Sequence, residues 1–275
     1  MKYLRQEVKK AIINANLLYT ILALILVYFI GMFVEPVRSA IKLYFSKATD
    51  ITIDMRNHMI CNSFNKITLF EFAVYAAPFL MPVIFSFPYA NSYFLERKSG
   101  YSKFLIVRGN YKDYIISKVL SNWISVIVSV IISNLVLFTF ISVINSGNQY
   151  RSIFLPDTQF LSNLFNNNFN LYFLIYTILI GLVAICISNI SMLSTIIFDN
   201  TVSGYIVPFL FYVLSEFWIK PLKLLGIRED SVIITLLFNR AHNISFWNIV
   251  LVDLIIIVAS TVAIYYNTVM SKINE

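Results

Sequence analysis

Long apolar stretches alternate along the chain with shorter polar segments that carry most of the charge. A membrane-spanning helix needs about 20 mostly apolar residues. Six stretches approach or exceed this length: 17–34, 69–89, 114–144, 171–198, 202–219 and 246–266. None shows the strict alternation over about ten residues that a β-barrel strand requires. The pattern predicts an all-α membrane protein with six transmembrane helices in a single domain, residues 1–275.

The composition supports this prediction and argues against a water-soluble or nucleic-acid-binding protein. Apolar residues make up 59% of the chain, against about 45–50% in a typical globular protein. The mean hydropathy of +0.75 is too high for a water-soluble domain, because one core cannot hide that much apolar surface. The net charge of +7 comes from bases in short segments between apolar runs. Such bases meet anionic lipid headgroups, so the charge does not indicate nucleic-acid binding.

The distribution of bases predicts the orientation in the membrane. Four bases and one acid precede the first apolar stretch, and six bases fall within residues 97–118, between the second and third. Short basic segments close to spans favour the cytoplasmic side. We therefore predict cytoplasmic N- and C-termini. Residues 2–13 and 37–48 each combine bases with apolar residues at helical spacing, which predicts interfacial amphipathic helices that anchor span ends.

Motifs of catalysis and nucleotide binding are absent from the sequence. It contains no G-x-x-x-x-G-K-[ST] loop for ATP phosphates and no H-E-x-x-H, G-x-S-x-G or C-x-x-C motif. His58 and His242, the two histidines, fall outside the six apolar stretches. These observations argue against an enzyme and against a metal or cofactor held by this chain. An intramembrane enzyme is the weakest of the functions considered.

The most specific stretch of sequence lies between the second and third apolar runs, at residues 89–121. It contains Glu96, Arg97 and Gly100, then the apolar patch 104–106, then further bases. Glycine favours helix ends, so Gly100 and Gly109 are expected to bracket a short helix of about two turns. A short amphipathic helix of this kind suits docking into a groove of a soluble partner.

In this stretch the chain resembles the permease subunits of ABC-2-type exporters. The residues that carry the resemblance, in order, are Glu96, Arg97, Gly100, Leu105, Arg108 and Lys118, and Phe104 lies beside Leu105 in the apolar patch. The resemblance implies that this segment is a coupling helix seated in a cytoplasmic ATPase subunit, of which two copies bind ATP and Mg. It also implies a second permease subunit, alternating access and a place in the cell membrane.

The resemblance leaves the substrate open, and other interpretations of the segment remain. The long polar segment 35–68 departs from the better-known polysaccharide and drug exporters, so the cargo is expected only to be an amphipathic peptide, a drug or a lipid-like molecule. The segment 89–121 also satisfies the description of an ordinary basic cytoplasmic loop. A membrane scaffold or sensor that holds a cytoplasmic partner is therefore the alternative function.

Polar residues within the apolar stretches form a second group of candidates. Serines recur every four residues from Ser117 to Ser133, including Ser125 and Ser129, which predicts either close helix packing or a polar wall of the translocation route. Glu71, Glu216 and Asp253 are expected in the outer third of the bilayer. They either pair with loop bases or line an acidic vestibule for cationic cargo.

Overall fold

The computed structural model describes residues 2–46, 52–75, 77–100, 111–145, 161–219 and 246–273. Within these ranges every regular element is a helix and none is a strand, which confirms the all-α prediction. Four helices are long and apolar enough to cross a membrane, at Ala15–Phe45, Tyr111–Ile144, Phe169–Phe198 and Val250–Val269. They indicate a multi-pass membrane protein.

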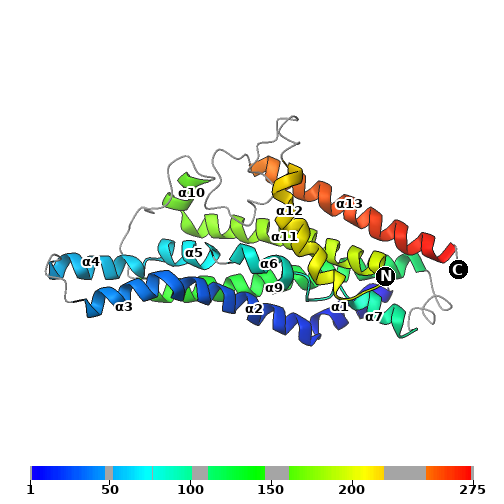
Figure 1. Cartoon of the computed structure of the whole chain (residues 1–275), viewed down its shortest axis with the longest axis horizontal. Coiled ribbons are helices and arrows are strands. Elements are labelled where there is room, and N and C mark those ends of the chain that lie inside the picture. Colours follow the sequence, from blue (N-terminus) through cyan, green and yellow to red (C-terminus); the bar gives the residue numbers. More distant parts are fainter. Residues whose placement is uncertain are drawn as a thin grey trace.

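The helices follow one another along the described parts of the chain. Their bounds are α1 Lys2–Ile12, α2 Ala15–Met32, η1 Phe33–Val37, α3 Arg38–Phe45, α4 Ile53–Ser63, α5 Lys66–Tyr75, α6 Ala77–Ile84, α7 Ser92–Lys98, α9 Tyr111–Ile144, α10 Ser162–Asn167, α11 Phe169–Phe198, α12 Ser203–Ile219 and α13 Phe246–Ile273. They form an elongated bundle (Figure 1).

Helix α11 is the centre of the bundle. It packs against α9, α12 and α13, while α9 also contacts α1 and α2. Of the 18 most apolar consecutive residues of α11, 67% are buried inside the structure, whereas the corresponding share for α13 is 22%. Helix α13 therefore lies at the periphery and presents most of its apolar surface outward.

The prediction of six transmembrane helices is confirmed only for the four long ones. The second predicted span, 69–89, corresponds to the two short helices α5 and α6, followed by turns from Phe85 onward. Pro82 inside α6 removes one backbone donor, which weakens the helix there. The fifth, 202–219, corresponds to α12, whose 17 residues fall short of the about 20 that span a hydrocarbon core.

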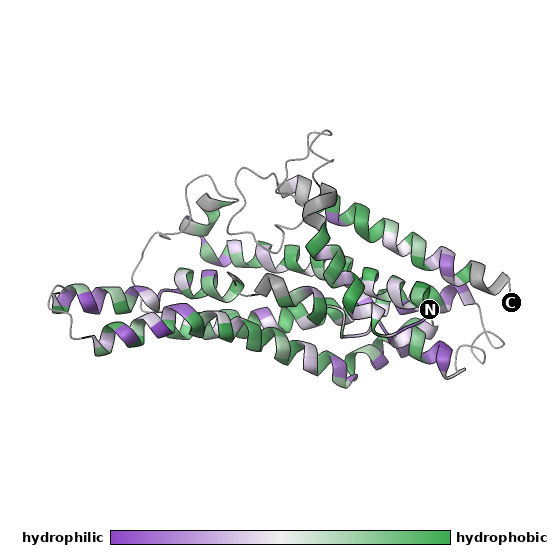
Figure 2. Cartoon of the chain, viewed as in Figure 1, coloured by the Kyte–Doolittle hydropathy of each residue, from purple (hydrophilic) through white to green (hydrophobic). Residues whose placement is uncertain are grey.

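The first span continues well past its predicted end. Helices α2, η1 and α3 form one 31-residue helix from Ala15 to Phe45. Pro36 lies in η1, a π-helical turn that accommodates the missing backbone donor. At about 1.5 Å per residue the whole helix is about 46 Å long, so α3 extends beyond a bilayer core. Together with α4 it forms the more polar end of the bundle (Figure 2).

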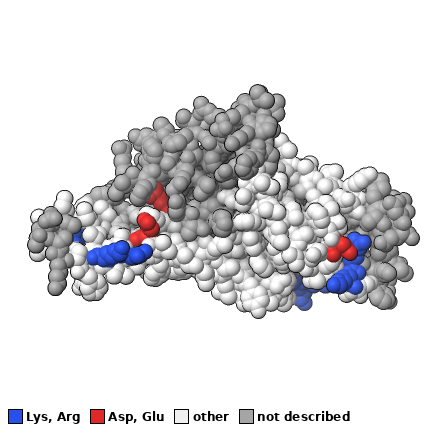
Figure 3. Space-filling model, in the orientation of Figure 1, with Lys and Arg blue, Asp and Glu red and all other residues white. Residues whose placement is uncertain are grey.

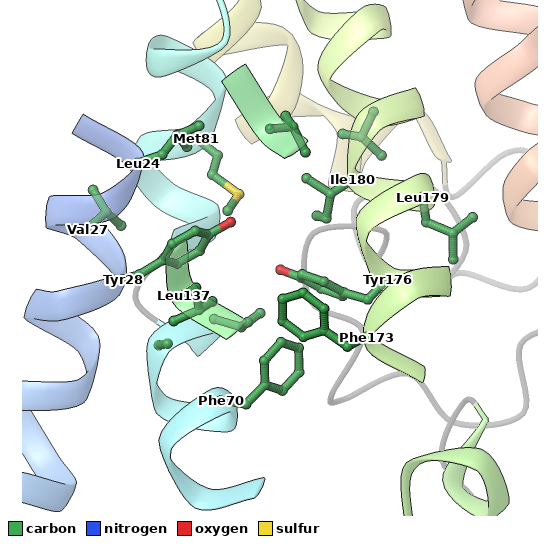
Figure 4. Packing of buried hydrophobic residues seen from close by; sticks show 14 of the residues in the cluster. Leu24, Val27, Tyr28, Phe70, Met81, Leu137, Phe173, Tyr176, Leu179 and Ile180 are labelled. Carbon is green, nitrogen blue, oxygen red and sulfur yellow. The ribbon is translucent and has the colours of Figure 1, made fainter. Parts of the chain in front are cut away.

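Aromatic side chains fill the core between α5 and α11. The ring of Phe70 lies 5.1 to 6.2 Å, centroid to centroid, from the rings of Phe165, Phe169, Tyr172, Phe173 and Tyr176. On the opposite wall Tyr28 of α2 points its hydroxyl toward that of Tyr176 (Figure 4). The Tyr28 hydroxyl donates a hydrogen bond to Asn134 Oδ1 of α9 at 2.9 Å. One core therefore joins α2, α5, α9 and α11.

Charged side chains gather toward the two ends of the bundle. On the face shown in Figure 3, the described surface between the ends carries neither acids nor bases. Helix α1, helix α7 and the last turns of α13 lie at one end, and α3 and α4 lie at the other (Figure 1). This separation of charge matches the requirement that a membrane places on a spanning protein.

The contact between α2 and α5 depends on a glycine. A Cβ atom at Gly31 would lie 2.3 Å from the backbone oxygen of Phe72, so a larger side chain forces the helices apart. We expect Gly31→Ala to destabilise the protein by about 1–3 kcal/mol. The midpoint of thermal unfolding in detergent measures the change. Gly181→Ala on α11 is the matched control, since a Cβ there meets no atom within 4 Å. Equal midpoints for the two variants would contradict this prediction.

Candidate functional site

Three segments that are distant in sequence meet at the end of the bundle that holds α1. Helix α1 packs along the first turns of α9, and α7 lies next to both (Figure 1). The segments are tied together by a cluster of charged and aromatic side chains, which we call the charge network. Its members are Glu7, Lys10, Tyr89, Glu96, Tyr114 and Lys118.

The local sequence directs α1 toward this position. Glu7 shares a helix face with Ala11, and both are buried, whereas the bases Arg5 and Lys9 are exposed. Asn14 separates α1 from α2 and caps the latter, because its side-chain oxygen accepts a hydrogen bond from the Asn16 amide at 3.1 Å. The same side chain donates to the carbonyl of Pro88 at 3.4 Å. The corner between α1 and α2 is thereby held against the turn that follows α6.

Lys118 is the centre of the charge network. Its side chain is completely buried, and its Nζ lies 2.5 Å from Glu7 Oε2 and 2.8 Å from Glu96 Oε1. The two carboxylates come from α1 and α7, which are far apart in the sequence. A buried ammonium group is tolerated only where opposite charges and hydrogen bonds replace water. Lys118 therefore fixes α1 and α7 to α9 at once.

Two tyrosines complete the coordination of the buried charges. The Tyr89 hydroxyl donates to Glu7 Oε2 at 2.7 Å and accepts from Lys118 Nζ at 3.1 Å. The Tyr114 hydroxyl donates to Glu96 Oε2 at 2.5 Å. The Lys118 ammonium also lies 4.8 Å from the ring centroid of Tyr89, within range of a cation–π interaction. Each carboxylate thus has an ammonium and a hydroxyl partner.

Lys10 closes the network on the solvent side and balances its charge. Its Nζ lies 2.9 Å from Glu7 Oε1 and 3.2 Å from Glu96 Oε1. Burial raises the pKa of Glu7, but the ammonium of Lys118 and the hydrogen bonds to its carboxylate outweigh burial and hold this pKa below its ordinary value. Burial lowers the pKa of Lys10, whereas Glu7 and Glu96 raise it overall. Glu7 and Lys10 are therefore both charged at neutral pH.

Helix α7 is shorter than the predicted coupling helix and precedes it. Gly100 follows α7 with a φ of +75°, a conformation that favours glycine, and its amide donates to the Arg97 carbonyl at 3.1 Å. Arg97 lies 3.9 Å from Asp199 at the end of α11, in a solvent-exposed pair that adds little stability. Phe104, Leu105 and Arg108 fall in 101–110, outside the described residues.

The structure therefore divides the predicted coupling residues into two groups. Glu96 and Lys118 lie together inside the charge network, Arg97 and Gly100 lie at the end of α7, and the apolar patch is not described. The first group holds the chain together, so its members are positioned to support the loop and not to touch a partner directly. The part of the stretch that would bind a partner stays a prediction.

The serine stripe of α9 lies inside the helix bundle. Ser125, Ser129 and Ser133 are fully buried, and the hydroxyls of the last two donate to backbone carbonyls of their own helix. Polar contacts between helices accompany the stripe: Ser188 donates to Asn122 Oδ1 at 2.9 Å, and Trp123 donates to Asn189 Oδ1 at 2.8 Å. This arrangement agrees with the packing interpretation of the stripe.

The three acids of the apolar stretches occupy different surroundings. Glu71 of α5 is buried near the aromatic core, and Asp253 of α13 is buried beside α11. Glu216 belongs to α12, but its side chain is outside the described residues. The expectation that Asp253 lies in the outer third of the bilayer stays a prediction; its backbone carbonyl accepts a hydrogen bond from the Cys186 thiol at 3.3 Å. Cys186 is just past the midpoint of α11.

The described side chains contain no group of three His, Cys, Asp or Glu residues that could hold a metal ion. The acids and bases of the charge network are mutually satisfied and mostly buried, so they offer no reactive group to a substrate. What the network can do is transmit a displacement of α7 to α1 and α9.

Sequence reasoning missed Glu7, Lys10 and Tyr89 as members of the site. A signal for Glu7 exists: it is the only acid of α1, and it lies four residues before Ala11 on the apolar face. A lone acid on an apolar helix face needs a basic partner from elsewhere in the chain. Its partner Lys118 lies 111 positions further along the sequence in α9, and no local pattern identifies such a pair.

No family model matches the chain, and no curated protein and no solved structure matches it either.

Removal of the central base tests the charge network. We expect Lys118→Met to destabilise the protein by roughly 3–5 kcal/mol, because it leaves the buried carboxylate of Glu7 and the partly buried one of Glu96 with Lys10 as the one remaining base of the network. The thermal midpoint in detergent should fall accordingly. Lys9→Met, on the exposed face of α1, is the control and should leave the midpoint unchanged. Adding Glu7→Gln and Glu96→Gln to Lys118→Met should restore most of the loss. A Lys118→Met variant as stable as the parent would refute the network.

The pKa of Glu7 gives a second test, by pH. Because this pKa is lowered in the folded chain, the carboxylate contributes stability above its ordinary value of 4.5, and this contribution is lost as pH falls through the folded pKa. We expect the thermal midpoint to decline between about pH 5 and pH 3, and Glu7→Gln to flatten that decline. Glu35→Gln, at an exposed site in η1, should leave it unchanged. An unaltered decline in the Glu7→Gln variant would count against the assignment.

Proposed function

We propose that this chain is the membrane-spanning permease subunit of an ATP-driven exporter of the ABC-2 type. Two copies of a separate cytoplasmic ATPase supply ATP and Mg binding and hydrolysis. A second permease subunit, identical or related, completes a pathway that alternates between inward- and outward-open states. The cargo is an amphipathic peptide, a drug or a lipid-like molecule. The complex lies in the cell membrane, with the end that holds α1 and α7 in the cytoplasm.

The observation that carries the proposal is the charge network. The segment that resembles a coupling helix begins directly after Gly100. Glu96, four residues before Gly100, is bound to Lys118 of α9 and to Lys10 of α1. A force applied to this segment by a partner would reach α9 and α1 through buried ionic contacts. A loop that served only to satisfy topology has no need of such a connection.

The orientation is supported by the placement of the basic segments. Helix α1, helix α7 and the last turns of α13 share one end of the bundle, as a chain with both termini on one side requires (Figure 1). The exposed bases Arg5, Lys9 and Lys98 lie at this end. Basic residues near span ends favour the cytoplasmic face, where anionic lipids also attract them. This end is therefore the one that an ATPase would meet.

Association with the ATPase is the decisive measurement. Leu105 lies in the apolar patch after Gly100, so Leu105→Asp would place an unpaired charge in the partner's groove and abolish association. Burying two large apolar side chains there is worth about 3–6 kcal/mol before ordering costs. The chain is pulled down from membranes. Mass spectrometry then identifies the captured partner, and an ATPase assay measures the activity of the captured complex.

Lys42→Ala is the matched control for this experiment. Lys42 is an exposed base on α3, at the opposite end of the bundle, and its loss should leave association intact. Membrane insertion and expression of both variants should equal those of the parent, because Leu105 lies outside the six apolar stretches and Lys42 is exposed. If Leu105→Asp still captures the ATPase, the segment is a basic loop only, and the scaffold or sensor function takes precedence.

A further inference from the structure

Asp253 lies on the one face of α13 that packs against the rest of the bundle. The buried residues of this helix recur at helical spacing: Asp253, Ile257, Ser260, Ile264 and Thr268. The opposite face carries exposed apolar side chains such as Leu251, Ile255 and Val258. The carboxyl group therefore points into a contact between helices, and only 3% of the residue is exposed.

The partner surface at Asp253 is apolar. Cys186 of α11 packs there in a cluster with Ile185 and Ile257, and Trp123 and Ile127 of α9 cover it. The Cys186 thiol donates to the Asp253 backbone carbonyl at 3.3 Å and lies 4.0 Å from Oδ1. Among the described residues, the second carboxyl oxygen, Oδ2, has no hydrogen-bond partner. A buried oxygen without a partner is unusual in a folded protein and calls for a ligand or a proton.

No base from the packed helices faces this carboxyl group. Helix α13 contacts α11 and α9, and α11 contains no acidic, basic or histidine residue. The charged residues of α9 are Lys112, Asp113 and Lys118, all near its first turns. Lys118 is committed to Glu7 and Glu96. Cys186, the only titratable group of α11 at this level, is itself buried. Bases of residues 220–245 lie outside the described residues.

The position of the site makes a bare charge unfavourable. Cys186 is just past the midpoint of the 30-residue α11, and Asp253 lies within Val250–Val269, a helix long and apolar enough to cross a membrane. An ionised, unpaired carboxylate within a spanning helix is unfavourable. A bound proton removes this cost, because a neutral carboxyl group needs only modest hydrogen bonding.

We propose that Asp253 is an intramembrane proton-binding site, occupied while α13 is packed against α11 and emptied when the two helices part and water reaches the carboxyl group. The proton leaves as the carboxyl becomes a carboxylate, so one proton is released for each opening. Low pH then favours the packed arrangement, and high pH favours separation. This site would add a proton-linked step to the conformational cycle, and it stands whether or not an ATPase drives that cycle.

Carbodiimide modification tests the protonation state directly. Dicyclohexylcarbodiimide is apolar and adds across the O–H of a protonated carboxyl group, and the acyl group then shifts to nitrogen to give a stable N-acylurea without a leaving group. We expect peptide mass spectrometry of the full chain, treated in native membranes at pH 7, to show this adduct on Asp253. Asp113, exposed to solvent at the start of α9, serves as the internal reference and should carry no adduct.

Asp253→Asn supplies the second measurement. A carboxamide has the shape of a neutral carboxyl group, so the variant should lose the adduct and keep the parent's thermal midpoint in detergent. Absence of the adduct from Asp253 in the parent would overturn the proposal. A midpoint in the Asp253→Asn variant that falls by several degrees would also overturn it, because it would reveal an ion pair with a base of residues 220–245. Neither result depends on whether the chain associates with an ATPase.

Discussion

The buried ammonium group of Lys118 determines how one end of the molecule is built. A charge with no access to water must bring its counter-charges with it, and here they come from the first helix and from α7. The position of α1 is therefore set by an ionic contact in addition to its amphipathic surface. Without the ammonium group, both carboxylates would bear the same desolvation penalty of a charge without its partner. We therefore expect α1, α7 and the first turns of α9 to fold together.

The same constraint explains the middle of the bundle. Polar groups of α9 and α11 are paired across the interface through Asn122–Ser188 and Trp123–Asn189, and Asn189 continues to Ser260 of α13. Lipid offers no hydrogen bonds, so such pairs add specificity to helix contacts that apolar packing alone leaves loosely defined. Where a pairing is incomplete, as at Asp253 Oδ2, a functional explanation is warranted.

The sequence predicted the long helices well because each is one uninterrupted apolar run. The stretches 171–198 and 114–144 differ from α11 and α9 by at most three residues at either end. The second stretch, 69–89, was predicted as one span, although it contains two short helices, one of them with Pro82, and turns after Ile84. Its apolar composition does not reveal these interruptions. The partners of Lys118 were not predictable, because pairing across 111 positions leaves no periodic trace.

The continuous helix from Ala15 to Phe45 has a geometric consequence. A stiff rod that begins beside the charge network and ends in the α3–α4 hairpin converts rotation at one side of a membrane into displacement at the other. A tilt of about 10° about the middle of a 46 Å helix moves its far end by about 4 Å. Gly31 allows the helix to pack closely against α5, so this contact is the point about which the helix would tilt. The α3–α4 hairpin would then be displaced at the far end of the bundle when α1 moves.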